Sequence, residues 1–331
     1  MRILKNPHID YLRWKWPALA VSAVIIISGL AVIFTRGIPM GIEFAGGTAV
    51  VAAFEQEVSL DQVRDAMGRT FGGENVVQSF GNPDQHQIMI RVPQVGAETG
   101  TELGEVVDKV TAALQSAGLP KFEIAYREAV GPAVGQQLRT QGFWAAVLAL
   151  GGILLYITFR YQFSFAIGAI IATVHDLLVT LAFLAFFQHD MTLNVIAALL
   201  TIAGYSSNDT IVIFDRVREN LRGMRRDAIR DVLNLSVNQT MSRTIITSGT
   251  ALFSALALYL FGGDVLRGFA FTLIIGLISG TYSTIFIAIA VVSMWRGQGP
   301  LKAAARAPAA TPSAPQQPTR KSKPQRKARA S

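Results

Sequence analysis

The sequence predicts a polytopic α-helical membrane protein with six transmembrane helices and a small α+β domain between the first and second helices. The chain of 331 residues is 51% hydrophobic and only 16% charged, whereas a soluble protein carries about 25% charged residues. Its apolar residues gather in six blocks, each of roughly 20 residues, the length that a helix needs to cross about 30 Å of hydrocarbon. Between the first two blocks lies a stretch of roughly 100 residues without such a run, which is enough for a small domain.

The six apolar blocks are the predicted membrane spans. The first, 17–34, follows the basic residues Arg2, Lys5, Arg13 and Lys15. A basic flank before an apolar run also occurs in signal peptides, but this run is about 18 residues long and no small-x-small cleavage motif follows it. We therefore expect an uncleaved anchor, with the first transmembrane helix at 17–35. The other five spans, within 143–295, are predicted at 143–159, 163–187, 193–214, 245–261 and 269–295.

Positive charge is distributed unevenly along the chain, whose net charge is +8. If both termini are cytoplasmic, the cytoplasmic segments contain 21 of the 30 lysine and arginine residues. The short loops on the other side then contain almost none, as the positive-inside rule requires. Segment 36–142 does not contradict the rule, because long translocated loops largely escape it. We expect cytoplasmic termini and an extracytoplasmic segment 36–142.

Segment 36–142 alternates between strand and helix patterns, in the order strand, helix, strand, strand, helix, strand. Ser59 suits the N-cap of the first helix, Gly118 follows the second, and the Gly81-Asn82-Pro83-Asp84 turn separates the two middle strands. This order predicts a ferredoxin-like fold, which says little about chemistry. We expect the domain to offer a binding or docking surface. The strands are predicted at 48–55, 76–80, 87–92 and 122–126, and the helices at 60–71 and 101–116.

Three further segments are predicted on the cytoplasmic side: the N-terminus 1–16, a basic loop 215–244 and a basic tail 296–331. The tail is rich in Ala, Pro, Gln, Lys and Arg without apolar periodicity, which predicts disorder. Its basic run 320–327 suits either nucleic acid or anionic lipid. Its position next to the membrane favours lipid, so no nucleic-acid partner is expected.

The chain contains no cysteine. This excludes a disulfide framework, a thiol nucleophile and a cysteine-based metal site. His175 has no second histidine near it in the sequence, so we do not expect it to bind a metal. No cofactor is predicted.

Two carboxylates lie inside predicted spans, Asp176 in the third and Asp209 in the fourth. A carboxylate at membrane depth costs on the order of 3 kcal/mol or more, so such residues usually face a protein interior and handle ions or protons. The alternative is that they pin helices together as buried ion pairs, although such pairs are weak evidence for stability. For Asp209 we favour proton handling. For Asp176 both interpretations stay open, because His175 or a nearby hydroxyl could simply satisfy it.

Polar residues repeat along the fourth span around Asp209. Tyr205 and Arg216 lie on its helical face. Asn208 and Thr210, together with the preceding serines, form a polar cluster that could admit water. A carboxylate in this setting is expected to take up and release a proton near neutral pH.

Arg243, at the start of the fifth span, is the strongest candidate for a cation that sets how easily Asp209 releases its proton. Helical rise places Asp176 and Asp209 at depths that differ by about 10 Å. An intramembrane aspartyl protease needs two carboxylates that share a proton. We therefore expect a proton path rather than an enzyme.

The stretch 202–220, IAGYSSNDTIVIFDRVREN, resembles the fourth-span signature of the SecF branch of the SecD/SecF family. Three shorter stretches are also similar to that family: 41–48 after the first span, Val174-His175-Asp176 in the third, and 238–244 at the start of the fifth. The resemblance covers residues 1–296 in order and spacing. Glu43 stands where the family pattern more often has Asp, and the basic tail matches no family motif.

The resemblance implies half of a larger RND-type assembly whose other half is SecD. Such assemblies associate with the SecYEG channel and with YajC in the bacterial inner membrane, and use the proton gradient to complete export of unfolded preproteins after SecA-driven insertion. Asp209 and Arg243 match the family's proton-transport positions. The alternative is a subunit of an RND-type small-molecule efflux pump. It is disfavoured because this chain has only half of such a pump's usual spans and a single outer domain.

Overall fold

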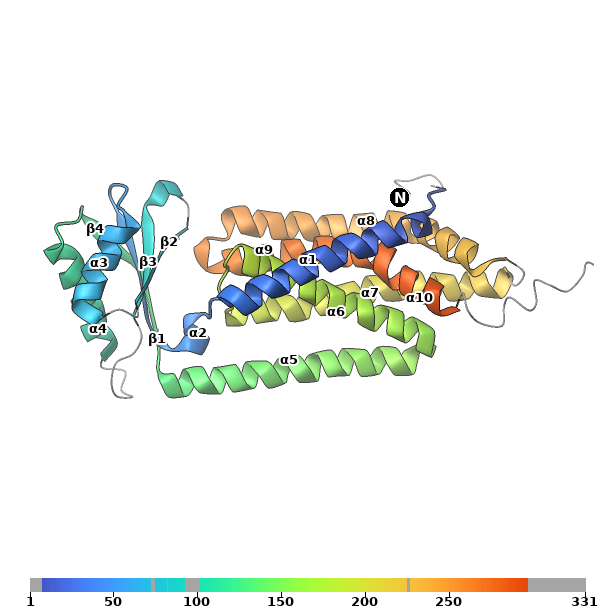
Figure 1. The fold of residues 1–331 in the computed structure, drawn as a ribbon, viewed down its shortest axis with the longest axis horizontal. Helices are drawn as coiled ribbons and strands as arrows, with labels where there is room; N and C mark the ends of the chain where they lie inside the picture. Colours follow the sequence, from blue (N-terminus) through green and yellow to red (C-terminus); the bar gives the residue numbers. More distant parts are fainter. Residues whose placement is uncertain (1–7, 73–74, 82, 93–101, 225–226, 297–331) are drawn as a thin grey trace, which may run out of the picture.

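The structure, a computed structural model, describes residues 8–72, 75–81, 83–92, 102–224 and 227–296. A long helical bundle carries a small α+β domain at one end (Figure 1). Within the described residues, six helices are long and apolar enough to cross a membrane. The predicted fold class, six membrane helices with an α+β domain between the first and second, is confirmed. The predicted basic tail from 297 onward and the first seven residues of the predicted N-terminal segment lie outside the described residues.

The bundle consists of long helices with short connections. A 3₁₀ turn, η1 (Tyr11–Trp14), leads into the first span, and the last span contains a π-helical turn, η3. The helices are α1 (Lys15–Arg36), α5 (Pro132–Arg160), α6 (Phe163–Phe186), α7 (Leu193–Gly223), α8 (Ile229–Phe261), α9 (Asp264–Ser283), η3 (Thr284–Ala288) and α10 (Ile289–Arg296).

Three spans form the centre of the bundle. Helices α6 and α7 and the α9–α10 span bury about half of their apolar length, whereas α1, α5 and α8 leave most of theirs exposed. Helix α5 runs along one side of the bundle, apart from the centre (Figure 1). Apolar surface of this extent is typical of helices that face lipid or another membrane subunit.

Helices α7 and α8 extend beyond the predicted spans. Because α7 continues to Gly223 and α8 begins at Ile229, most of the predicted loop 215–244 is helical. The polar continuation of α7 is supported by side-chain pairs one turn apart, such as Arg216 with Glu219 at 2.5 Å. A polar composition ends a membrane span, but it does not end a helix.

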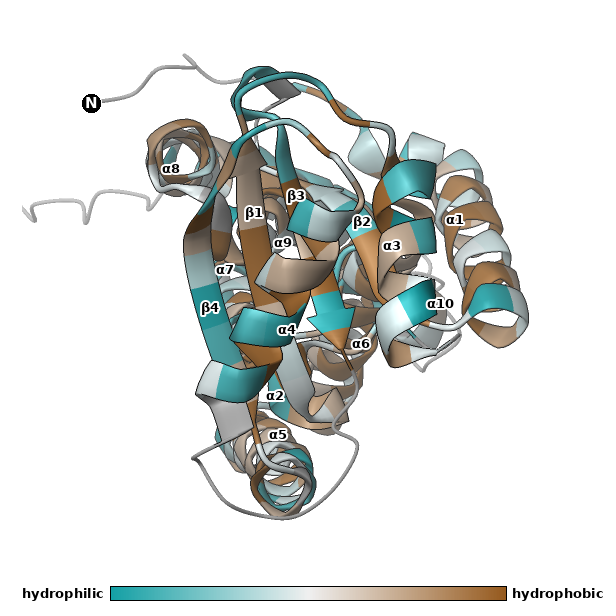
Figure 2. Ribbon diagram, turned by 90° about the vertical axis from the view of Figure 1, so that its left-hand side faces the viewer, coloured by the Kyte–Doolittle hydropathy of each residue, from teal (hydrophilic) through white to brown (hydrophobic). Residues whose placement is uncertain are grey.

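The sheet domain contains four strands in the order β2-β3-β1-β4, all antiparallel, which is the predicted ferredoxin-like arrangement. Helices α3 and α4 cover one face of the sheet. Figure 2 shows β1 as largely hydrophobic and the edge strand β4 as more hydrophilic. The opposite face of the sheet is directed toward the bundle (Figure 1). The elements are α2 (Ile42–Ala45), β1 (Gly47–Phe54), α3 (Leu60–Phe71), β2 (Val76–Phe80), η2 (Pro83–Gln85), β3 (Gln87–Val92), α4 (Glu102–Ser116) and β4 (Phe122–Val130).

Candidate functional site

Small residues let α9 approach α7 and α6 closely at the centre of the bundle. A Cβ atom on Gly276 would lie 2.1 Å from the Cδ1 atom of Ile202. One turn later, a Cβ atom on Gly280 would lie 3.3 Å from the Cβ atom of Ser206 and 3.7 Å from a carboxylate oxygen of Asp176. This small-xxx-small spacing is a common device for close helix packing in membranes. It brings α9 against the two helices that carry the predicted acids.

Asp176 is fully buried and surrounded by donors. Its Oδ2 atom accepts hydrogen bonds from the hydroxyls of Ser206 at 2.5 Å and Ser283 at 2.7 Å. Its Oδ1 atom accepts one from Ser279 at 2.8 Å and lies 3.0 Å from Nδ1 of His175. A charged group can remain in a low-dielectric interior when its oxygens are satisfied in this way. Helices α6, α7 and α9 therefore meet at one carboxylate.

His175 connects this carboxylate to α1. Its Nε2 atom lies 2.8 Å from the hydroxyl of Ser22. The Ser22 hydroxyl also lies 3.3 Å from that of Tyr282, which donates to the carbonyl of Ala18 at 2.7 Å. Both ring nitrogens of the histidine thus have a polar partner. A continuous line of hydrogen-bonding groups runs from α1 to Asp176.

Asp209 lies on α7, three residues after Ser206, and is 7% exposed. Its Oδ1 atom accepts a hydrogen bond of 2.9 Å from the hydroxyl of Thr244 on α8. Its Oδ2 atom is buried and has no hydrogen-bond partner among the described residues. A buried polar atom without a partner is costly, and the cost falls when the group binds a proton or when a cation approaches. This half-satisfied carboxylate differs from the fully satisfied Asp176.

Arg243 precedes Thr244 on α8, and its side chain is exposed at the bundle surface. Arg243 is therefore next to the residue whose hydroxyl bonds Asp209, but in the described part of the chain the side chains of Arg243 and Asp209 form no direct ion pair. The structure therefore brings the predicted acid and cation onto neighbouring helices and leaves the contact between them open.

The supporting residues predicted around Asp209 have separate partners. The hydroxyl of Tyr205 lies 3.4 Å from Ser248, and that of Thr210 lies 3.1 Å from Thr284 in the π-helical turn. Asn208 is exposed. Arg216 bonds Gln239 of α8 at 2.6 Å and Glu219 of α7 at 2.5 Å, and within the described part of the chain it makes no hydrogen bond or ion pair with Asp209.

The two acids lie closer in depth than the sequence predicts. Ser206, which binds Asp176, is three residues before Asp209, an axial rise of about 4.5 Å. The predicted difference of about 10 Å was too large because it was measured along each helix separately, whereas the hydrogen bond between Asp176 and Ser206 relates the two helices directly. Among the described residues, no hydrogen bond joins the two carboxylates. Each carboxylate has its own donors, which are Ser206, Ser279 and Ser283 for Asp176 and Thr244 for Asp209.

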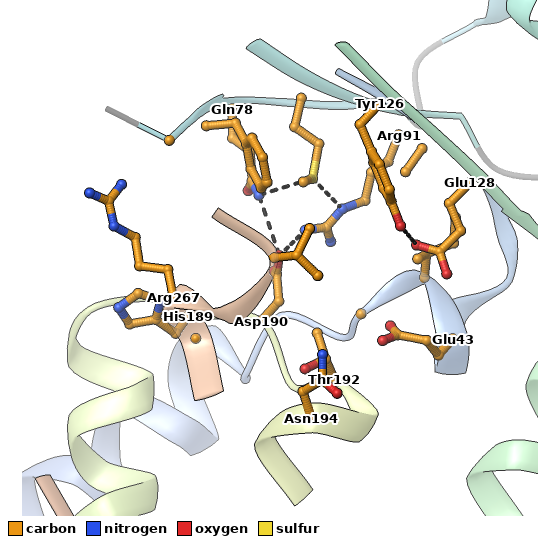
Figure 3. A pocket seen from close by; sticks show the side chains of 18 of the residues that line it. Glu43, Gln78, Arg91, Tyr126, Glu128, His189, Asp190, Thr192, Asn194 and Arg267 are labelled. Carbon is orange, nitrogen blue, oxygen red and sulfur yellow. Dashed lines mark hydrogen bonds and ion pairs between the residues drawn. The ribbon is translucent and has the colours of Figure 1, made fainter. Parts of the chain in front are cut away.

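A second polar region lies between the sheet domain and the near end of the bundle (Figure 3). It is a pocket of about 370 Å³. Burial, followed by the nearby charges of Glu128 and Asp190, raises the pKa of Glu43. Burial also lowers the pKa of His189. Burial and a hydrogen bond of 2.8 Å to Glu128 raise the pKa of Tyr126 to about 12.

The comparisons with known proteins identify the family. Residues 109–298 match the family described as protein export membrane protein SecD/SecF, C-terminal, and residues 31–58 match the SecD/SecF GG motif. The chain is 44% identical over 292 residues to protein translocase subunit SecF of Pseudomonas aeruginosa, covering 88% of this chain and 92% of the relative. It is 40% identical to SecF of Escherichia coli O157:H7, covering 85% and 86%. The chain belongs to the SecF family of protein translocase subunits.

Two solved SecDF structures also match this SecF-family chain. One is a crystal structure of SecDF from Thermus thermophilus, described as a translocon-associated membrane protein, with a TM-score of 0.78 and 33% identity over 88% of this chain. The other is SecDF in a super-membrane-facing form, with a TM-score of 0.65 and 32% identity over 92% of this chain. The chain spans 39% and 41% of those two proteins. The family predicted from the sequence is confirmed, and it is a transport family rather than an enzyme family.

In this SecF-family chain, several partners of the two acids were missed from the sequence. Ser279 and Ser283 are four residues apart inside an apolar span, so they share a helical face, and that spacing was an available signal. Thr244 lies inside one of the family-like stretches, beside Arg243. The π-helical turn that begins at Thr284, directly after Ser283, gave no signal in the sequence. Such turns often lie at functional sites.

Proposed function

We propose that this SecF-family chain acts with SecD to couple the proton gradient to late-stage export of preproteins across the bacterial inner membrane. The observation that carries the proposal is the buried carboxylate of Asp209, with one oxygen bonded to Thr244 and the other without a partner among the described residues. Its charge is only partly compensated by the protein. It is therefore the acid whose protonation changes the local electrostatics most.

The proposed switch is the charge of Asp209. When ionised, the carboxylate attracts Arg243 across the α7–α8 contact; when a proton neutralises it, that attraction disappears. The loss biases the bundle toward a second arrangement. A proton that crosses 100 mV releases about 2.3 kcal/mol, enough to change a two-state equilibrium about fiftyfold.

Asp176 is proposed as a second station on the same path. Its cage includes Ser206 of α7, one turn from Asp209, and His175, which continues the polar line toward α1. Hydroxyl groups can donate to an ionised carboxylate or accept from a protonated one. The cage can therefore follow a change in the protonation of Asp176 without moving the helices far.

The exposed polar face of α7 and α8 supports SecD as the partner. Asn208 lies within the predicted fourth span and Arg243 just before the predicted fifth, yet both are exposed. An arginine at membrane depth is costly unless it faces protein or water. We place SecD over this face. The SecYEG channel, YajC and SecA act around the pair, and the sheet domain on the extracytoplasmic side meets the emerging preprotein.

The proposal is tested with proteoliposomes that contain SecD, SecYEG, SecA and this chain. Asp209→Asn should remove the gradient-dependent part of export and leave the ATP-driven part unchanged. Arg243→Lys keeps the charge but loses the planar fork of donors, so it should retain part of the stimulation. The matched control is Asp215→Asn, because Asp215 is on the same helix and its side chain is 52% exposed.

Full gradient stimulation in Asp209→Asn would overturn the proposal. Normal export combined with lost gradient-dependent transport of small molecules would instead indicate an efflux subunit.

A further inference from the structure

We propose that Asp190 and Arg91 are the positioning residues that carry movement of the acid-bearing helices, α6 and α7, into the sheet domain. The proposal rests on the proposed function, because it describes how a protonation change in the bundle reaches the domain that meets the preprotein. Asp190 lies in the short connection 187–192 between α6 and α7. A shift of the helices that carry Asp176 and Asp209 therefore moves this connection with them.

The side chain of Asp190 is bonded to two strands of the sheet domain. Its Oδ2 atom forms an ion pair with Arg91 of β3 and accepts a hydrogen bond of 3.4 Å from Gln78 of β2. The side chains of Arg91 and Asp190 are only 15% and 20% exposed. An ion pair that is largely shielded from water is screened less than one on the surface, and removing one partner leaves an uncompensated charge. The contact can therefore transmit force between the connection and the sheet.

The backbone of the same connection is fixed to the segment that leads from α1 into the domain. The Met191 amide donates to the carbonyl of Pro39 at 2.7 Å, and the Gly41 amide donates to the carbonyl of Met191 at 2.8 Å. Arg91 also donates to the carbonyl of Met40 at 3.1 Å. Arg91 thus holds both the connection and the entering segment.

The side-chain contact is needed because the backbone around it can bend. Gly37, Gly46 and Gly47 have φ angles of 75°, 73° and 106°, a region open to glycine but strained for other residues. They lie on both sides of the fixed segment, at the start of the domain. The pocket beside the Arg91–Asp190 pair (Figure 3) means that close packing does not fill this junction. The ion pair then determines how the sheet follows α6 and α7.

The test uses charge exchange in the full complex, with proton flux and gradient-dependent export measured in the same vesicles. Arg91→Asp and Asp190→Arg should each keep proton flux and lose the gradient-dependent part of export. The double variant restores a pair of opposite charges and should restore coupling. The matched control is Arg64→Asp, since Arg64 is on α3 of the same domain and its 2.6 Å pair with Asp61 is exposed.

A second measurement does not depend on the fold tolerating reversed charges. The chain has no cysteine, so the double variant Arg91→Cys with Asp190→Cys carries thiols only at these two positions. Without a cross-link, this double variant should lack gradient-dependent export. Linking the two thiols with a reversible bifunctional reagent should restore it.

The outcomes separate this proposal from the proposed function. If wild type carries no proton flux, or Asp209→Asn leaves flux unchanged, the proposed function fails. If flux depends on Asp209 but the single charge reversals export normally, or the cross-link blocks export instead of restoring it, then Arg91 and Asp190 are not the coupling residues.

Discussion

Thr244 on α8 donates a hydrogen bond of 2.9 Å to Asp209 on α7, and this bond holds one carboxylate oxygen while the other remains without a partner among the described residues. The hydrogen bond fixes the orientation of the carboxylate. Because it reaches only one of the two oxygens, the carboxylate is incompletely satisfied. A group held in this way is stable enough to stay ordered, yet its charge state still affects its neighbours.

Thr244→Val tests the orienting role, because it keeps the shape of the side chain and removes the hydroxyl. Leaving the Asp209 oxygen without its donor should cost about 1–3 kcal/mol of stability and reduce gradient-dependent export. Export in vesicles and thermal unfolding of the purified complex measure the two effects. Thr247→Val is the matched control, since Thr247 is exposed one turn away and its hydroxyl bonds the backbone carbonyls of Arg243 and Thr244. Equal losses of stability and export at both positions would show that the hydrogen bond to Asp209 does not cause them.

The hydroxyl cage of Asp176 predicts a cumulative loss of stability. Ser279→Ala and Ser283→Ala each remove one donor from a fully buried carboxylate, so each should cost about 1–3 kcal/mol. Because they bond the same carboxylate, the double variant should deviate from additivity. Thermal unfolding checks this, with Ser254→Ala as the control because Ser254 is exposed and bonds a backbone carbonyl of its own helix. Single variants as stable as that control would mean that the cage contributes nothing to stability.

Close packing of α9 on α7 predicts a size limit at Gly276. In Gly276→Ala the new Cβ atom would lie 2.1 Å from the Cδ1 atom of Ile202, and overpacking of this kind costs about 1–3 kcal/mol. Combining it with Ile202→Ala should recover part of the loss by making room. Gly204→Ala is the control on α7, since its added Cβ would meet nothing within 4 Å among the described residues apart from its chain neighbours and the nearby backbone of its own helix. A neutral Gly276→Ala would contradict the close approach of the two helices.

The fold could be predicted because each element has its own signal in the sequence. Blocks of apolar residues predicted the six spans, and alternating patterns predicted the order of strands and helices in the sheet domain. Asp209 was visible for the same reason, since a single carboxylate stands out in an apolar block. These signals are local, because each can be read without knowing which other elements of the chain the segment contacts.

Contacts between distant elements could not be predicted in this way. Ser279 and Asp176 are 103 positions apart, and Arg91 and Asp190 are 99 apart. Their meeting depends on how helices cross and how the sheet domain sits on the bundle, and spacing along the chain contains neither. Spacing along the chain also predicted a relationship that the structure does not have. Arg216 lies on the same helical face as Asp209, but its side chain bonds Gln239.

The pocket beside the sheet domain predicts a pH-dependent stability that involves Glu43. Burial, then the charges of Glu128 and Asp190, raise the pKa of Glu43 above its ordinary value of 4.5. The folded protein therefore binds this proton more readily than the unfolded chain does. The resulting stability is fully present below pH 4.5 and is lost as the pH rises through the raised pKa.

Glu43→Gln should remove this dependence, because the amide stays neutral at every pH. Thermal unfolding of the purified protein, measured from about pH 4 to about pH 8, would show a smaller decrease in the midpoint for the variant than for wild type. Glu57→Gln is the matched control, since Glu57 is an exposed acid of the same domain. If Glu43→Gln and wild type change in parallel over this range, ionisation of Glu43 is not what destabilises the junction between the sheet domain and the bundle.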